Sequence, residues 1–123
     1  MNEFYREEWK TIPDQPTHQV SNYGRVRSLK RTIEQRNVHD PLWPITRRLP
    51  QRVVNQFTTK NGYRRVNLSG KGNTHYVHRL VLRTFVGEPP RGKSFAVHGP
   101  NGRSDNSLWN LSWGGRKDLE RSA

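Results

Sequence analysis

The chain has 123 residues, with 22 Lys and Arg against 10 Asp and Glu, and its hydrophobic share of 30% is below that of most globular proteins. This length supports one thin-cored unit or two very small modules, and it is short for an enzyme with an enclosed cleft. Because the chain has no cysteine, disulfides, a thiol nucleophile and a cysteine zinc site are all excluded.

The formal net charge of +12 comes mostly from Arg, whose planar guanidinium suits phosphate better than the ammonium of Lys. Nucleic acid is therefore the expected partner. No apolar stretch approaches the roughly 20 residues of a membrane-spanning helix, and the charged opening MNEFYREEWK is unlike a secretory signal. We expect a cytoplasmic protein with no membrane or small-molecule partner, whereas the sequence does not predict an oligomeric state.

The N-terminal segment has the pattern of a β-hairpin. Trp9 and Ile12 begin an extended stretch, HQVS leads into the turn SNYG, and RVRSL returns as a second strand. Alternation places Val26 on one face and Arg25 and Arg27 on the other. A solvated basic edge would have the same pattern, but the surrounding positive charge favours phosphate contact.

The segment 32–51 has no regular period and contains three of the eight prolines, so we interpret it as a linker or excursion. Two strands are predicted after it, over 53–57 and 63–69, on either side of the turn KNG. We interpret Trp43 and Trp109 as packing residues rather than as platforms for bases.

Apolar residues fall at helical spacing from position 76 onward. The helix should end near Gly87, because Gly and a double Pro follow the last periodic residue. Short strands are predicted around Ala96 and over 111–113, and a final helix over 116–121. The predicted buried stripe of the first helix is Val77, Leu80, Val81, Thr84 and Phe85.

The long polar loop HGPNGRSDNSLWN, residues 98–110, contains the residue types of a metal-dependent phosphodiesterase. A neutral His98 can take a proton from water near pH 7, and asparagine amides can fix the loop without adding charge. A metal held without cysteine would have oxygen and imidazole ligands, which suit Mg²⁺ or Mn²⁺. An Asx-rich surface loop is the alternative interpretation.

Several stretches together resemble a known family. HYVHRLVLRTFVGEPPRGK and VHGPNGRSDNSLWNLSW resemble the His-containing helix, the His-Gly-x-x-Gly loop and the Asn-Leu-x-Trp strand of HNH homing endonucleases, particularly those abundant in phages of actinobacteria. Upstream, EEWKTI and VSNYGRVRSL resemble the nuclease-associated modular (NUMOD-type) motif often found in front of that nuclease. The motifs follow each other in the family's order, so their pairing is far more specific than either alone.

The resemblance implies an α+β fold, in which small antiparallel hairpins are followed by a helix and a ββα-metal (His-Me finger) HNH motif. It divides the chain into a NUMOD-type DNA-binding module at 1–31, a linker or excursion at 32–51 and an HNH nuclease domain at 52–123. The implied function is metal-dependent nicking or cutting of double-stranded DNA by water that a His activates. The candidate DNA-binding residues are Arg25, Arg27, Lys30, Arg31, Arg64 and Arg65.

Residue roles carry over by position in the motif. His98 is the general base, and Asn110 is the central Asn whose side chain bridges the loop and keeps the His in place. Asp105 and Asn106 fall at the paired polar positions that brace the turn. His78 matches the family's first His, but it lies beside the buried stripe, which favours a structural or phosphate-binding role over catalysis.

The chain departs from the family's pattern at the metal ligands. Relatives place Asp or Asn before the base, where this chain has Val97, and Asn or His in the final helix, where the register gives Leu119. The candidate ligands for one Mg²⁺ or Mn²⁺ are therefore Asp118 or Glu120 of that helix and Asp105 of the loop. Three functions stay open: a metal-dependent DNA endonuclease, a DNA-binding protein with a degenerate HNH site, and an RNA-binding accessory protein.

Overall fold

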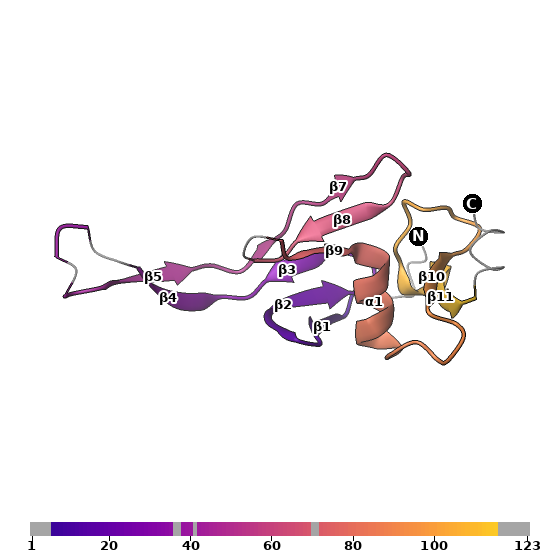
Figure 1. The fold of residues 1–123 in the computed structure, drawn as a ribbon, viewed down its shortest axis with the longest axis horizontal. Coiled ribbons are helices and arrows are strands. Elements are labelled where there is room, and N and C mark those ends of the chain that lie inside the picture. The colour runs from indigo at the N-terminus through magenta and orange to yellow at the C-terminus, as the bar shows by residue number, and fades with distance from the viewer. Residues whose placement is uncertain (1–5, 36–37, 41, 70–71, 116–123) are drawn as a thin grey trace.

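A computed structural model describes residues 6–35, 38–40, 42–69 and 72–115. Small antiparallel sheets surround the one helix of this part of the chain, which confirms a mixed α and β fold (Figure 1). That helix is too short and too polar to cross a membrane, and no other membrane-spanning candidate lies among the described residues. The elements are β1 (Trp9–Ile12), β2 (Gln15–Ser21), β3 (Val26–Ser28), β4 (Arg31–Gln35), β5 (Ile45–Leu49), β6 (Arg52–Val53), β7 (Phe57–Thr58), β8 (Arg64–Asn67), β9 (Thr74–Tyr76), α1 (Val77–Phe85), β10 (Phe95–His98), the 3₁₀ turn η1 (Leu108–Asn110) and β11 (Leu111–Gly114).

The first sheet has the strand order β1-β2-β3-β6, with all neighbours antiparallel. The predicted turn SNYG joins β2 to β3: the Ser21 hydroxyl accepts hydrogen bonds from the backbone N–H groups of Tyr23 and Arg25. Gly24 has a φ of 86°, a left-handed conformation that glycine adopts without strain. The predicted N-terminal hairpin is therefore present in the fold.

The single strand predicted over 53–57 is wrong, because the chain changes sheets within it. Its start pairs with β3 as β6, and its end pairs with β8 as β7 in the sheet β7-β8-β9. Between them, Val54 donates to the Val26 carbonyl and the Gln56 side chain donates to the Gly24 carbonyl. A periodicity argument cannot detect a crossover of this kind, since both halves have strand-like residues.

The core lies where α1 packs on the first sheet and on β8. The helical stripe predicted from spacing is confirmed at Val77, Leu80 and Val81, which are buried, whereas Thr84 and Phe85 are half-buried. The sheets contribute Ile12, Val20, Val26, Val66 and Leu68 to the same cluster. The helix ends as expected: Val86 and Gly87 both donate to the Leu82 carbonyl, and Gly87 has a φ of 114°.

The segment 32–51 holds the antiparallel hairpin β4–β5, which projects away from the body of the molecule (Figure 1). The sequence predicts a linker or excursion here, and its lack of a regular period gives no sign of this strand pairing. Trp43, near its tip, is 71% exposed, so the expectation that it packs in the interior is wrong. The division of the chain into modules at 31 and 51 stays a prediction.

The turn between β2 and β3 packs on the loop that joins β10 to β11. The backbone N–H of Leu108 donates to the Asn22 carbonyl at 2.8 Å, and Tyr23 meets Trp109 edge to face, with ring centroids 5.1 Å apart. A Cβ on Gly24 would lie 2.8 Å from the carbonyl oxygen of Asn106. The first hairpin thus supports the polar loop through direct contact.

This contact predicts different costs for two Gly→Ala substitutions. Gly24 and Gly92 both have positive φ values, 86° and 80°, so alanine strains the backbone at either site, but nothing lies within 4 Å of a Cβ at Gly92. Overpacking should make Gly24→Ala lower the free energy of unfolding by about 1 to 3 kcal/mol more than Gly92→Ala. Urea unfolding measures both, and equal losses would contradict the tight contact.

Candidate functional site

His98 ends β10 opposite Leu111 and has only 3% of its surface exposed. Its Nε2 lies 2.7 Å from Oδ1 of Asn106. An amide oxygen only accepts hydrogen bonds, so Nε2 carries the proton of the neutral ring and Nδ1 is the basic nitrogen. The bond therefore fixes both the orientation and the tautomer of His98.

The side chain of Asn110 spans the loop from within. Its Oδ1 accepts from the backbone N–H of Asn101 at 3.2 Å, and its Nδ2 donates to the carbonyls of Gly102 at 3.2 Å and Asp105 at 2.8 Å. The backbone of Asn110 also accepts from Gly99 at 2.7 Å, and a Cβ at Gly99 would come within 2.8 Å of Oδ1. One buried amide therefore ties three points of the loop together.

Asp105 and Asn106 were both predicted to brace the turn, but their side chains make different contacts. The Asp105 carboxylate accepts from the Asn101 side chain at 2.9 Å and from the Ser107 backbone at 3.0 Å. Burial raises the pKa of this carboxyl, but the hydrogen bonds from Ser107 and Asn101 together outweigh it and leave the pKa below its usual value. Asp105 braces the turn, whereas Asn106 contacts His98.

His98 belongs to a cluster of aromatic rings. The ring centroid of His78 lies 4.6 Å from that of His98, and Tyr63 stacks on His78 at 5.2 Å with an interplanar angle of 20°. Tyr76 adds a fourth ring 5.5 Å from His78, and the guanidinium of Arg103 lies 4.8 Å over Tyr63. Sequence reasoning missed Tyr63, which belongs to no motif and which only the fold brings to the loop, and it assigned no role to Arg103, which lies within the loop itself.

Burial keeps both histidines of this cluster neutral. Desolvation, then the charges of His98 and Arg79, lower the pKa of His78 to about 3, and its Nδ1 is buried without a hydrogen-bond partner. The pKa of His98 is lowered chiefly by burial and further by Arg103, against the opposing hydrogen bond of Asn106. At neutral pH His98 is therefore in the form that can accept a proton.

The predicted DNA-binding arginines and lysine lie on three different elements. On β3 and the turn before it, Arg25 forms an ion pair with Glu7, and Arg27 hydrogen-bonds Gln19 and lies 4.2 Å over the Trp9 ring. On β8, the half-buried Arg64 and Arg65 adjoin the ring cluster, with Arg65 5.1 Å over Tyr76. Lys30 and Arg31 line a hollow at the base of the β4–β5 hairpin.

The described residues do not by themselves fit a metal site. Within them, no group of three or more His, Asp and Glu side chains is close enough to hold an ion. Val97 has no ligating atom, and both oxygens of Asp105 accept hydrogen bonds. Asp118, Leu119 and the final predicted helix lie outside the described residues.

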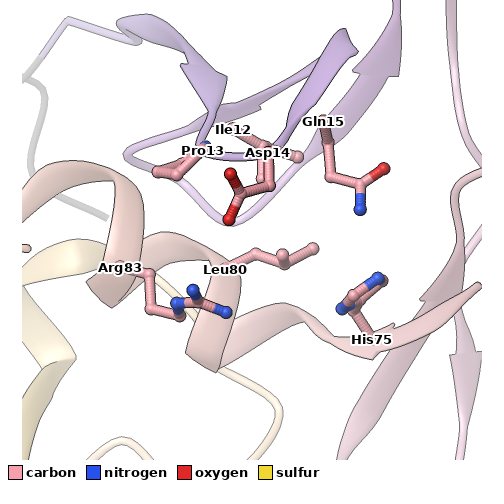
Figure 2. A pocket seen from close by; sticks show the side chains of 7 residues that line it. All are labelled: Ile12, Pro13, Asp14, Gln15, His75, Leu80 and Arg83. Atoms are coloured by element: carbon pink, nitrogen blue, oxygen red, sulfur yellow. The ribbon is translucent and has the colours of Figure 1, made fainter. Parts of the chain in front are cut away.

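A separate cavity of about 160 Å³ lies between the β1–β2 turn and α1 (Figure 2). None of the expected site residues lines it, so it is distinct from the polar loop. Its lining residues are Ile12, Pro13, Asp14, Gln15, His75, Leu80 and Arg83.

The arrangement is similar to that of a known nuclease class. A solved structure described as "DNA binding and cleavage by the HNH homing endonuclease I-HmuI" matches 93% of this chain, with a TM-score of 0.65 and 27% sequence identity. This chain covers 56% of the length of that one. The NUMOD4 motif matches residues 7–69, more than half of the sequence, and the chain belongs to this family. No curated protein sequence matches it significantly.

The Asn110 amide should be a large contributor to stability. Asn110→Ala leaves the Asn101 N–H and two carbonyls without partners, and we expect it to lower the free energy of unfolding by at least about 2 kcal/mol. The matched variant Asn101→Ala removes a single exposed side-chain hydrogen bond to Asp105 and should cost less than about 1 kcal/mol. Urea unfolding compares the two, and similar losses would refute the bracing role of Asn110.

His78 should make stability depend on pH. Its folded-state pKa of about 3 lies below the ordinary value of 6.5, so the unfolded chain binds more protons between these values and stability falls as pH drops through them. From pH 7 to pH 5 the His78 contribution amounts to about 2 kcal/mol. His78→Phe keeps a ring against Tyr63 and should lose correspondingly less stability over that range. Parallel stability curves for the two proteins would show that His78 is not held neutral.

Proposed function

We propose that this chain binds double-stranded DNA and hydrolyses its phosphodiester bonds at the loop 98–110, as an HNH-type endonuclease. The observation that carries the proposal is the state of His98: neutral, fixed in one tautomer by Asn106 and mounted on a loop that Asn110 holds. The likeness to an HNH homing endonuclease and the NUMOD4 motif, which is nuclease-associated and DNA-binding, support DNA as the partner.

In the proposed reaction His98 acts as the general base. Its Nδ1 takes a proton from water as the water oxygen bonds to phosphorus, and the bond from phosphorus to the 3′ oxygen breaks. The products are a 3′-hydroxyl, which takes a proton from solvent, and a 5′-phosphate. Arg103, which lies close enough to lower the pKa of His98, would offset the charge that develops on the phosphate.

Other residues are assigned supporting roles. Asn110, Asp105 and Asn106 position the base, and we assign His78 to positioning as well, because its neutral ring packs on His98 rather than facing solvent. We assign DNA binding chiefly to the NUMOD4 part of the chain, residues 7–69, and the chemistry to the loop 98–110. All six predicted DNA-binding residues lie within residues 7–69.

We propose that cleavage requires one divalent cation, Mg²⁺ or Mn²⁺, and this requirement can be measured. The described residues do not by themselves supply its site, and the candidate ligands that remain from the sequence are Asp118 and Glu120.

A second function, DNA binding without cleavage, is favoured by a specific observation. Val97, which directly precedes the base, is an apolar residue buried at 8% exposure, so this position offers no ligating atom for a metal. A protein that had lost its metal ligands in this way would keep the basic surface and the loop but not the chemistry.

Supercoiled plasmid distinguishes the two functions. With Mg²⁺ or Mn²⁺ the wild-type protein should nick or linearise the plasmid, and EDTA should stop it. His98→Ala should reduce the rate about 100-fold or more, as expected when a general base is lost. His75→Gln, a substitution at a histidine outside the cluster, should leave the rate unchanged.

Binding is measured separately, by fluorescence anisotropy with a labelled 30-bp duplex in EDTA. His98→Ala should bind this duplex as tightly as the wild type. Tight binding without cleavage under any metal condition supports the second function, and full activity of His98→Ala contradicts the assignment of the base. A preference for structured RNA as competitor would contradict DNA as the partner.

A further inference from the structure

The β4–β5 hairpin is a prominent feature that the proposed chemistry does not use. Its two strands pair in continuous register from Arg31 opposite Leu49 to Gln35 opposite Ile45. It extends well beyond the sheets that form the core (Figure 1), and the side chains of β5 are exposed except for the half-buried Leu49. A hairpin with so little buried surface contributes little to folding stability, so its length calls for another explanation.

The base of the hairpin gathers positive charge around a hollow. Arg31, Arg47, Arg48 and Arg52 line a cavity of about 360 Å³, and Lys30 lines the adjoining one with Arg31 and Arg48. The ion pairs of the described residues, Arg25 with Glu7 and Arg83 with Glu88, lie elsewhere. Like charges held together without a counter-charge repel each other, and a bound anion relieves that repulsion. Arginine forks match the oxygens of a phosphate.

The tip of the hairpin is apolar instead. Leu42 is 86% exposed and Trp43 71%, and the nearby Val38 and Ile45 are exposed as well. Asp40 orders the turn, because its carboxylate accepts from the Leu42 N–H at 3.2 Å and its carbonyl accepts from the Trp43 N–H at 3.1 Å. Large apolar side chains that are grouped and exposed at the end of a projecting hairpin indicate a contact surface for a partner.

We propose that β4–β5 is a DNA-binding arm: the arginines at its base hold backbone phosphates, and Leu42 and Trp43 at its tip insert between base pairs and untwist the duplex. Apolar wedges flanked by cations are used in this way by proteins that kink DNA. A second copy of this chain would bring the same +12 charge to the arm, whereas a nucleic acid neutralises it. The inference rests on the proposed binding of DNA but not on cleavage.

The tip is tested by DNA topology. Closed circular plasmid is relaxed by a metal-independent type I topoisomerase in the presence of the protein and EDTA. Insertion of the tip is then recorded as a shift in the linking number of the plasmid. The wild type should produce a shift. The double variant Leu42→Ala/Trp43→Ala should lose most of the shift yet bind plasmid within a few-fold of the wild type. The control variant Val86→Ala truncates a side chain that is 62% exposed but lies outside the arm, and it should shift the linking number as the wild type does.

The base is tested by the salt dependence of binding to a 30-bp duplex. Arg47→Ala/Arg48→Ala should reduce the slope of log K against log salt concentration by about 1.8, the value for two lost phosphate contacts. The control Arg91→Ala/Lys93→Ala removes the same charge from the exposed loop after α1 and should leave the slope unchanged.

Each outcome has a distinct meaning. An unchanged linking-number shift in the tip variant, or no shift from bound wild-type protein, overturns insertion. An unchanged slope in the base variant overturns phosphate binding there. If sedimentation shows that the tip variant converts a wild-type dimer to monomers, the tip is instead a contact between copies. Failure of the wild type to bind DNA at all would refute the proposed function itself, before any variant is compared.

Discussion

The candidate site depends on the hydrogen bonds of one buried amide, that of Asn110. The loop after β10 contains glycines and polar residues with no apolar core of its own, so its shape must come from hydrogen bonds. Asn110 supplies them at Asn101, Gly102 and Asp105, and Gly99 leaves the space that its oxygen occupies. An amide does this without introducing a charge that burial would penalise.

Two further sets of contacts turn a fixed loop into an ordered site. The β2–β3 turn presses Gly24 against Asn106, which in turn holds Nε2 of His98. On the other side, His78 and Tyr63 pack around the same imidazole. The NUMOD4 part of the chain therefore does more than add charge, because its first hairpin and β8 region form walls of the loop.

Much of this was predictable where local sequence decides structure. The helical stripe around Val77 and Leu80 and the turn at Gly24 follow from spacing and from residue type, and the loop 98–110 follows from its glycines and amides. The packing of Tyr63 on His78 was not predictable, because Tyr63 lies just before β8 and His78 lies in α1, and only the tertiary fold brings the two rings together. The charged residues of both strands, and the prolines directly before and after β5, also concealed the β4–β5 hairpin, whose pairing is nearly independent of burial.

The bracing of the loop by Asn110 is tested most directly by amide hydrogen exchange. The backbone N–H of Asn101 donates to Asn110 Oδ1, although Asn101 itself is an exposed residue. Its exchange should therefore be slowed well beyond that of the exposed Ser104 in the same loop, and Asn110→Ala should abolish the difference. Equally fast exchange of Asn101 and Ser104 in the wild-type protein would contradict a loop that Asn110 holds in place.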